Sequence, residues 1–304
     1  MKETGTGRQL LVIGGDADPN LKCLAAAAER AGEKVLTLFT GKDTHPALTW
    51  EVNSGTCLFD GRPLRCSAAF IRHDVFSGLA DKRQASHYRA LAWFTSVHGW
   101  LAVNPNIRIF NRKSLNQVTN KPQVLHLAQE AGLPIPHTIV TNDFSYIEGK
   151  EAGTELVVKP VNGGGYCESF KEVAEKTDLK DGRAAAPAIV QNRLAQPEVR
   201  IYIVGKKLYA FNMVTDELDY RATQSCRVVY REEVPEELIP GYRKLLGQLA
   251  LDFAAADFKT DPEDGKLRFL EVNTGPMFAA FDAASNGILC DAMVQALMRK
   301  RERE

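Results

Sequence analysis

The stretch FAAADFKTDPEDGKLRFLEVN, residues 253–273, decides the prediction of the fold. Two apolar runs flank the turn sequence DPEDG, a pattern that is typical of a β-hairpin. Because side chains alternate between the two faces of a strand, Glu271 and Asn273 face the same side, and the turn returns them beside Asp257. Two carboxylates and an amide supply hard oxygen ligands, which Mg²⁺ binds together with phosphate oxygens and water. The hairpin therefore predicts a magnesium site.

A plain sheet face with polar residues is the alternative to this metal site. Leu270 and Val272 are expected to supply the opposite, buried face of the second strand. The first strand begins with the run FAAA, which is too apolar for a strand that is exposed to solvent. Both observations favour the metal site.

The rest of the chain predicts an α/β fold. Leu10 to Ile13 form a short apolar strand, an alanine-rich helix follows from Pro19 to Ala31, and Val35 to Phe39 is a second strand. This β-α-β order predicts a parallel sheet. We expect an N-terminal parallel α/β domain over residues 1–112, a central domain over residues 113–186, and a C-terminal α+β domain with the hairpin over residues 187–304.

The composition argues against several classes of protein. Among the 304 residues, 38 Lys and Arg balance 38 Asp and Glu, so a broad basic surface for nucleic acid is not expected. The six cysteines form no C-x-x-C pair and are expected to be scattered reduced thiols. No apolar stretch has the length of a membrane helix or a signal segment, so we expect a cytoplasmic protein that binds no membrane.

Two lysines, Lys121 and Lys159, are candidate phosphate ligands. Lys159 ends an apolar strand just before a loop of three glycines, Gly163 to Gly165. Glycine lets backbone N–H groups approach a phosphate closely, and lysine supplies a point charge. The loop lacks the P-loop pattern, and no G-x-G-x-x-G is present, which weakens the P-loop and Rossmann alternatives. Taken alone, the lysine and the glycine loop are also compatible with a surface turn.

The segment after residue 188 offers contacts for a nucleoside. A predicted strand ends at Gln191 and leads into the extended connector Asn192 to Leu194, whose backbone groups can meet an adenine edge. Glu198 follows Gln191 by seven residues and is placed to hold ribose hydroxyls, and Arg200 is placed to reach phosphate. Each of these features is uninformative alone.

The order of these motifs resembles the ATP-grasp superfamily, and within it the branch of ribosomal-protein glutamate ligases and microviridin-type graspetide cyclases. The N-terminal stretches FDGR, residues 59–62, and FIRH, residues 70–73, resemble the pre-ATP-grasp domain of that branch. The resemblance spans nearly the whole chain. The other stretches that carry it are TNKPQ (119–123), GLPIPHT (132–138), VVKP (157–160), QNRLAQPEVR (191–200), LDYR (218–221), ADF (256–258) and LEVN (270–273).

The resemblance implies a role for each candidate residue. Two departures from the family pattern are Asn192, where an acid is common, and Thr274, which replaces the usual proline after Asn273. Adenine contacts near Asn192 are therefore expected to rest on the backbone. By resemblance, ATP is held by Lys121, Lys159, Gly163, Gly164, Gly165, Gln191, Asn192, Leu194 and Glu198; the transferring phosphoryl group and the acyl phosphate by Arg200 and Arg221; Mg²⁺ by Asp257, Glu271 and Asn273; and the acceptor by Arg72.

The function implied is an ADP-forming ligase that joins a peptide or amino-acid carboxylate to an amine through an acyl phosphate. The expected cofactors are ATP and two Mg²⁺ ions, for which Mn²⁺ can substitute, and a homodimer is a further expectation. A first alternative is a macrocyclase that forms ester or amide cross-links in a ribosomal precursor peptide. A second is a catalytically inactive, nucleotide-binding regulatory module, which the intact set of lysines and metal ligands argues against.

Overall fold

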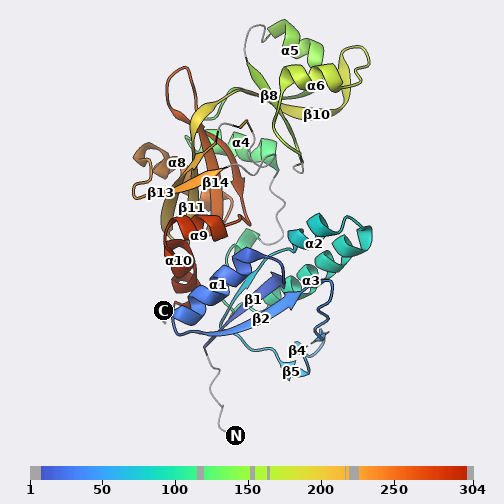
Figure 1. Ribbon diagram of the computed structural model, residues 1–304, viewed down its shortest axis with the longest axis vertical. Coiled ribbons are helices and arrows are strands. Elements are labelled where there is room, and N and C mark those ends of the chain that lie inside the picture. Colours follow the sequence, from blue (N-terminus) through green and yellow to red (C-terminus); the bar gives the residue numbers. More distant parts are fainter. Residues whose placement is uncertain are drawn as a thin grey trace. The chain divides into compact units, whose positions relative to one another are not determined.

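The computed structural model describes residues 8–114, 120–150, 155–162, 165–215, 217–218 and 226–299, and of residues 148 and 150 only the backbone. The chain divides into two compact units (Figure 1). Unit 1 consists of Met1–Leu115, Val204–Lys206 and Met277–Glu304, and unit 2 of Asn116–Ile203 and Lys207–Pro276. The three domains predicted from the sequence were consecutive, whereas unit 1 takes up the C-terminal segment as well.

Unit 1 is built on a parallel three-stranded sheet. Its order is β2 (Lys34–Thr40), β1 (Gln9–Gly15) and β6 (Ala68–Ile71), with both neighbours parallel to β1. The crossover from β1 to β2 is helix α1 (Pro19–Arg30), whose first turn is capped by the Asp18 carboxylate. The central strand is almost entirely buried, as a strand covered on both faces must be. The parallel α/β domain predicted from the β-α-β order is confirmed.

Further elements cover this sheet. The small antiparallel sheet of β3 (Leu48–Glu51), β4 (Thr56–Phe59) and β5 (Arg62–Pro63) turns at the Asp60-Gly61 pair, both with positive φ. The N-terminal part of the chain contributes helices α2 (Val75–Ala80) and α3 (Gln84–Val103) and the short 3₁₀ helix η1 (Arg112–Ser114). The C-terminal segment adds α9 (Ala279–Ala284) and α10 (Ile288–Met298), and α10 packs beside α1 (Figure 1).

Unit 2 contains an antiparallel sheet in the order β7, β10, β8, β9. These strands are β7 (Thr138–Asp143), β10 (Arg183–Asn192), β8 (Leu156–Pro160) and β9 (Glu168–Ser169), and helices α5 (Phe144–Lys150) and α6 (Phe170–Lys176) accompany them. Its core is small and includes Ile147, Val158 and Val190. The region from Lys171 to Ala186 is helical only at its start and becomes strand at Arg183.

The second sheet of unit 2 carries the predicted hairpin. Its order is β13 (Arg227–Arg231), β12 (Lys207–Val214), β11 (Ala195–Val204), β14 (Phe253–Thr260) and β15 (Leu267–Asn273). Helix α4 (Lys121–Glu130), the short 3₁₀ helix η2 (Glu236–Leu238) and α8 (Ile239–Gln248) contribute to the core cluster on one face. The residues just before the Asn120 N-cap of α4, 116–119, lie outside the described residues.

A β-bulge interrupts the pairing of β14 with β15. Asp257 pairs with Glu271, but the next residue, Phe258, pairs with Phe269, so Leu270 is the extra residue. Phe269 and Val272 are therefore both buried in the core, and Leu270 is only partly buried. The expectation that Leu270 shares the buried face with Val272 was wrong, because a bulge shifts the alternation of side chains by one residue. None of the described helices is long and apolar enough to cross a membrane.

Candidate active site

A buried ion pair lies at the centre of the candidate site. Arg200 on β11 faces Asp257 on the neighbouring strand β14, and its Nε and Nη2 atoms donate hydrogen bonds of 2.6 and 2.8 Å to the two carboxylate oxygens. Both residues are buried, with 8% and 5% of their surface exposed. Asn273 Nδ2 donates a third, longer bond of 3.3 Å to Asp257 Oδ2. The two-pronged contact fixes the Asp257 carboxylate in position.

A second buried pair lies beside the first on the same sheet face. Glu198 precedes Arg200 by two residues and Lys259 follows Asp257 by two, so strand alternation places all four side chains together. Lys259 Nζ lies 3.7 Å from Glu198 Oε2. Burial raises the pKa of Glu198, the nearby Asp257 carboxylate raises it further, and the surrounding cations oppose both effects. Burial also raises the pKa of Asp257, which the Arg200 guanidinium opposes.

The entrance of this cluster is formed by the start of α4 and the end of β15. Lys121 is the first residue of α4, whose N-cap is Asn120. Lys121 Nζ lies 3.0 Å from Glu271 Oε2, and both side chains are 29% exposed. Glu271 is the direct ladder partner of Asp257, so the predicted approach of the two hairpin carboxylates is confirmed. Their role as metal ligands stays a prediction.

The other sheet of unit 2 contributes Lys159, on β8. Its charge lowers the pKa of both Glu198 and Asp257, so this lysine acts on the buried carboxylates of the neighbouring sheet. Beyond β8, a side chain at Gly165 would meet the Pro160 ring at 3.1 Å, which leaves little room for any other residue there. Gly163 and Gly164 of the predicted loop lie outside the described residues, as does Arg221.

The predicted adenine connector follows β10. Gln191 is buried, and its Nε2 donates to Thr138 Oγ1 at 2.9 Å, so this side chain ties β10 to β7. The backbone N–H of Asn192 donates to His137 at 3.2 Å. Asn192 Oδ1 is buried, and within the described part of the chain it has no hydrogen-bond partner, which is unusual for a carbonyl oxygen inside a protein. Leu194, which follows Asn192 closely in the sequence, is also buried. Asn192 therefore offers a vacant acceptor where the sequence predicts adenine contacts.

Arg72, the predicted acceptor residue, is a buried residue of unit 1. Its Nε donates to Asp18 Oδ2 at 2.9 Å, and Nη2 lies 3.1 Å from Met277 Sδ. The guanidinium carbon lies 5.9 Å from the centre of the Phe278 ring. Arg72 thus joins the end of β6 to the residue before α1 and to the C-terminal segment. Its role in acceptor binding stays a prediction.

Sequence reasoning missed Lys259 as a member of the buried cluster. The signal was present, because Lys259 follows Asp257 at strand spacing and therefore shares its face. Glu198, the partner of Lys259, was predicted to hold ribose. In the structure the Lys259 ammonium already lies beside the Glu198 carboxylate, so this carboxylate has a positively charged neighbour before any ligand binds.

Comparisons with solved structures place this geometry in a known fold. Neither a protein-family model nor a curated protein matches the sequence. The ATP-grasp ligase PsnB in complex with minimal precursor, Mg and ADP aligns with a TM-score of 0.73 and 24% identity over 98% of this chain and 99% of that one. The macrocyclase MdnC from Microcystis aeruginosa, bound with precursor peptide MdnA, aligns with 0.72 and 17% over 96% and 100%. D-alanyl-alanine synthetase A from Vibrio cholerae aligns with 0.61 and 16% over 97% and 98%.

The chain has the ATP-grasp fold. This confirms the α/β architecture and the ATP-grasp fold that the motif resemblance implied. In this chain the polar cluster occupies one face of the five-stranded sheet of unit 2, and the hydrophobic core occupies the other. A shared fold alone does not establish an activity.

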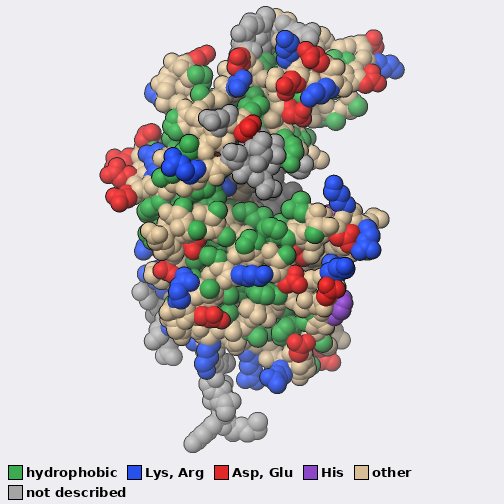
Figure 2. Space-filling model, viewed as in Figure 1, with side chains coloured by type: hydrophobic (Ala, Val, Ile, Leu, Met, Phe, Trp, Pro, Cys, Tyr) green, Lys and Arg blue, Asp and Glu red, His purple; other side chains and the backbone are tan. Residues whose placement is uncertain are grey.

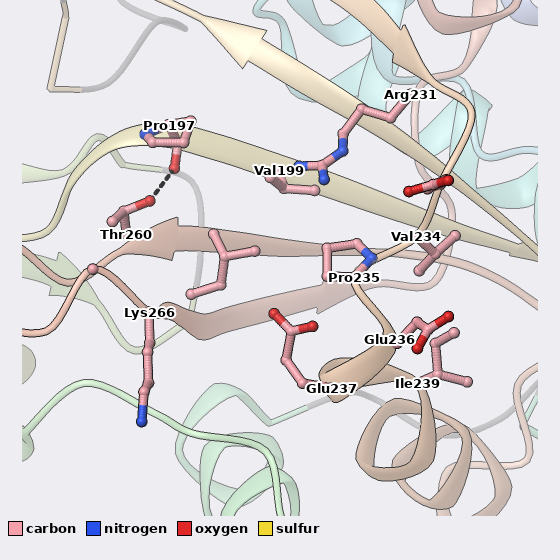
Figure 3. A pocket seen from close by; sticks show the side chains of 13 residues that line it. Pro197, Val199, Arg231, Val234, Pro235, Glu236, Glu237, Ile239, Thr260 and Lys266 are labelled. Carbon is pink, nitrogen blue, oxygen red and sulfur yellow. Dashed lines mark hydrogen bonds between the residues drawn. The ribbon is translucent and has the colours of Figure 1, made fainter.

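A pocket of about 860 Å³ lies elsewhere on unit 2 (Figure 3). One of its lining residues, Val199, belongs to the core cluster, so the pocket is on the core side of the sheet, opposite the polar cluster. Figure 2 shows acidic side chains gathered where Figure 1 places β13 and α8. The remaining lining residues are Pro197, Arg231, Glu233, Val234, Pro235, Glu236, Glu237, Ile239, Thr260, Gly265, Lys266 and Leu267.

Proposed function

We propose that this chain is an ADP-forming ligase. It would use ATP and Mg²⁺ to phosphorylate a substrate carboxylate and then join the acyl group to an amine. The observation that carries the proposal is the convergence of Asp257 and Glu271 with Lys121, Lys159 and Arg200 around one polar sheet face. A triphosphate with Mg²⁺ needs this combination, hard oxygen ligands for the ion and fixed cations for the phosphates.

The residues present fit the nucleotide and its metal. Asp257, Glu271 and Asn273 supply carboxylate and amide oxygens on adjacent strands. The buried, unsatisfied Asn192 Oδ1 can accept a hydrogen bond from the exocyclic amine of adenine, and its backbone N–H is already used by His137. This refines the expectation that the backbone alone carries the adenine contact. When bound, Mg²⁺ neutralises charge on the phosphate oxygens.

An exchange of partners at the entrance would accompany nucleotide binding. Lys121 and Glu271 satisfy each other at 3.0 Å in the structure, and both remain partly exposed. With the nucleotide bound, Glu271 would turn its oxygen to the metal, and the Lys121 ammonium would turn to a phosphate. Each charge thus keeps a partner of opposite sign in both states, which limits the cost of binding.

The inner residues would position the reacting groups. Arg200 holds Asp257 by two hydrogen bonds, so the carboxylate enters the reaction already oriented. Lys159 would contact phosphate from the other sheet. Arg221 would stabilise the transferring phosphoryl group and the acyl phosphate, a role that rests on the motif resemblance. Gly163 to Gly165 would close over the triphosphate and exclude water, which would otherwise hydrolyse the acyl phosphate.

A peptide carboxylate is the favoured substrate. The PsnB and MdnC structures contain precursor peptides, and they align with higher TM-scores than D-alanyl-alanine synthetase A does. The same observation supports the second candidate, a macrocyclase that forms ester or amide cross-links in a precursor peptide. Location in the cytoplasm, a second metal ion, substitution by Mn²⁺ and a homodimer belong to this proposal as further expectations.

The experiment is mass spectrometry of candidate peptides after incubation with the full chain, ATP and Mg²⁺. An added amino acid identifies the ligase, and loss of one water without an added residue identifies the macrocyclase. Hydroxylamine in the reaction should trap the acyl phosphate as a hydroxamate. The Glu271→Gln variant is the control for background hydrolysis. Tight ATP binding with no ADP release across the peptide panel would instead identify the regulatory module.

A further inference from the structure

Three helices of unit 1 bring two cysteines and an aspartate together. Cys23 lies on α1, Asp282 on α9 and Cys290 on α10. The two sulfurs, 267 residues apart in sequence, lie 3.4 Å from each other, and Cys23 Sγ donates to Asp282 Oδ2 at 3.1 Å. One ligand atom from each residue lies within 4.8 Å of the other two. The cysteines that sequence reasoning treated as scattered therefore include a close pair with a carboxylate.

These separations are close to those of metal ligands. Two thiolates on a tetrahedral Zn²⁺ lie about 3.7 Å apart, and a thiolate and a carboxylate oxygen about 3.5 Å apart, given Zn–S and Zn–O bonds of about 2.3 and 2.0 Å. The observed distances of 3.4 and 3.1 Å differ from these by a few tenths of an ångström. Small side-chain adjustments would thus complete the geometry.

The Asp282 carboxylate is held in a defined orientation. The backbone N–H of Cys290 donates to Oδ1 at 2.7 Å, which turns the other oxygen, Oδ2, towards Cys23. The backbone of Asp282 is itself anchored, since its N–H donates to Phe278 at 2.8 Å. A hydrogen bond to the non-ligating oxygen is the usual way in which a protein orients a metal-binding carboxylate.

The charge balance also favours a cation. Asp282 is only 4% exposed, and over the described part of the chain no lysine, arginine or histidine forms an ion pair with it. A buried carboxylate without a cationic partner is costly. A disulfide between Cys23 and Cys290 would bring no positive charge to this carboxylate, whereas a divalent cation would.

We propose that Cys23 Sγ, Cys290 Sγ and Asp282 Oδ2 bind one Zn²⁺ ion, separate from the magnesium site of the proposed ligase. Thiolates together with one carboxylate are a ligand set that suits zinc. The two thiol protons are released to solvent when the ion binds. Cys290 is fully buried and Cys23 is partly exposed, so a water molecule completes the tetrahedron on the Cys23 side. The ion joins α1 to α9 and α10 and thereby holds the C-terminal segment in unit 1.

The test is a Co²⁺ titration of the full chain after treatment with chelator and a reductant that does not bind metal. One equivalent of Co²⁺ should produce thiolate-to-cobalt charge-transfer absorption, and Zn²⁺ should abolish it. The Cys23→Ser and Cys290→Ser variants should each lose at least tenfold in affinity, and Asp282→Asn should weaken binding while leaving both thiols in place. Cys66→Ser, a change at a partly buried cysteine of the same unit, is the matched control and should bind like the parent chain.

Thermal unfolding provides a second readout that does not depend on activity. Zn²⁺ should raise the Tm of the parent chain and of Cys66→Ser, and it should leave the Tm of Cys290→Ser unchanged, because a ligand stabilises only the state that binds it. The proposal is overturned if the charge-transfer band is absent, or if it persists in both cysteine variants. It is also overturned if the fully reduced chain takes up no metal but forms a Cys23–Cys290 disulfide with an added disulfide oxidant.

Discussion

Arg200 and Asp257 meet across adjacent strands as a buried pair joined by two hydrogen bonds. Removal of one partner from such a pair costs more stability than the intact pair contributes, because the remaining charge stays buried and uncompensated. The candidate site is therefore also a point on which the fold of unit 2 depends. Variants of the site must be tested for stability before their activity is interpreted.

We expect Arg200→Ala to lower the free energy of unfolding by about 3–5 kcal/mol, because it leaves Asp257 buried without a partner. Urea denaturation measures this change. The matched control is Arg193→Ala, whose partner Glu155 is exposed, and for which a loss below about 1 kcal/mol is expected. Equal losses in the two variants would show that the Arg200–Asp257 contact carries no special weight.

Glu271→Gln should remove ADP release while it preserves the fold. The side chain is partly exposed, so an isosteric amide is tolerated, but the amide lacks the negative charge with which the Glu271 carboxylate would attract Mg²⁺. Turnover over a range of Mg²⁺ concentrations measures the effect, and we expect a loss of at least about 10²-fold. Glu263→Gln makes the same chemical change in the exposed turn of the hairpin and should behave like the parent chain. Full ADP release by Glu271→Gln would remove Glu271 from the metal site.

Lys159→Ala should weaken ATP binding. A desolvated contact between a charged group and a phosphate is worth about 1.5 kcal/mol or more, which corresponds to about a tenfold increase in Kd. Isothermal titration calorimetry in the presence of Mg²⁺ measures the affinity. Lys207→Ala removes an exposed lysine at the start of β12 and serves as the control. An unchanged Kd in the Lys159 variant would reject its role in phosphate binding.

The buried Glu198 should make stability depend on pH. Its pKa is raised in the folded state, so the folded chain is least penalised when this group is protonated. The contribution of Glu198 to the free energy of unfolding is fully present below the pKa of about 4.5 that this group has in the unfolded chain. It is lost as the pH rises through the higher pKa of the folded chain. Glu198→Gln cannot ionise and should lose less stability between about pH 4 and pH 8 than the parent chain. Thermal melts across this range decide, and parallel curves for the two proteins would contradict the prediction.

Arg221→Lys should lower the rate of the chemical step far more than it lowers ATP affinity. Arginine can grip a developing acyl phosphate at two oxygens, and lysine cannot reproduce that geometry. We expect a loss of about 10²-fold in single-turnover rate with little change in nucleotide Kd. Arg227→Lys, at an exposed position on β13, is the control. A normal chemical rate combined with poor nucleotide binding would instead assign Arg221 to the nucleotide.

The hairpin was predictable because its information is local. The turn sequence and the alternation of apolar residues fix which strands pair, and the ladder then places Glu271 opposite Asp257. The bulge at Leu270 was not predictable, because nothing in the residues LEVN distinguishes a regular strand from one with an extra residue. Strand β13 and the first part of β10 were missed, since polar edge strands lack a clear apolar pattern.

The sequence allowed us to predict which residues belong to the candidate site, but not which of them form ion pairs with one another. Single-sequence reasoning identified Arg200 and Lys121 as cations for phosphate, but only the folded chain shows that they pair with Asp257 and Glu271. The approach of Cys23 to Cys290 depends on the return of the C-terminal segment to unit 1, and no local pattern encodes contacts at such sequence separation. Tertiary packing, rather than propensity, decides these relationships.

Unit 1 is formed by segments that come before and after unit 2 in the sequence, and this arrangement has a consequence for biosynthesis. On the ribosome, β1 and α1 emerge before unit 2, whereas α9 and α10 emerge after it. All residues of unit 2 are synthesised before unit 1 has its full set of helices. Unit 1 therefore begins folding before unit 2 is made but is completed after it, and the face of α1 that packs against α10 stays uncovered until α10 has been synthesised.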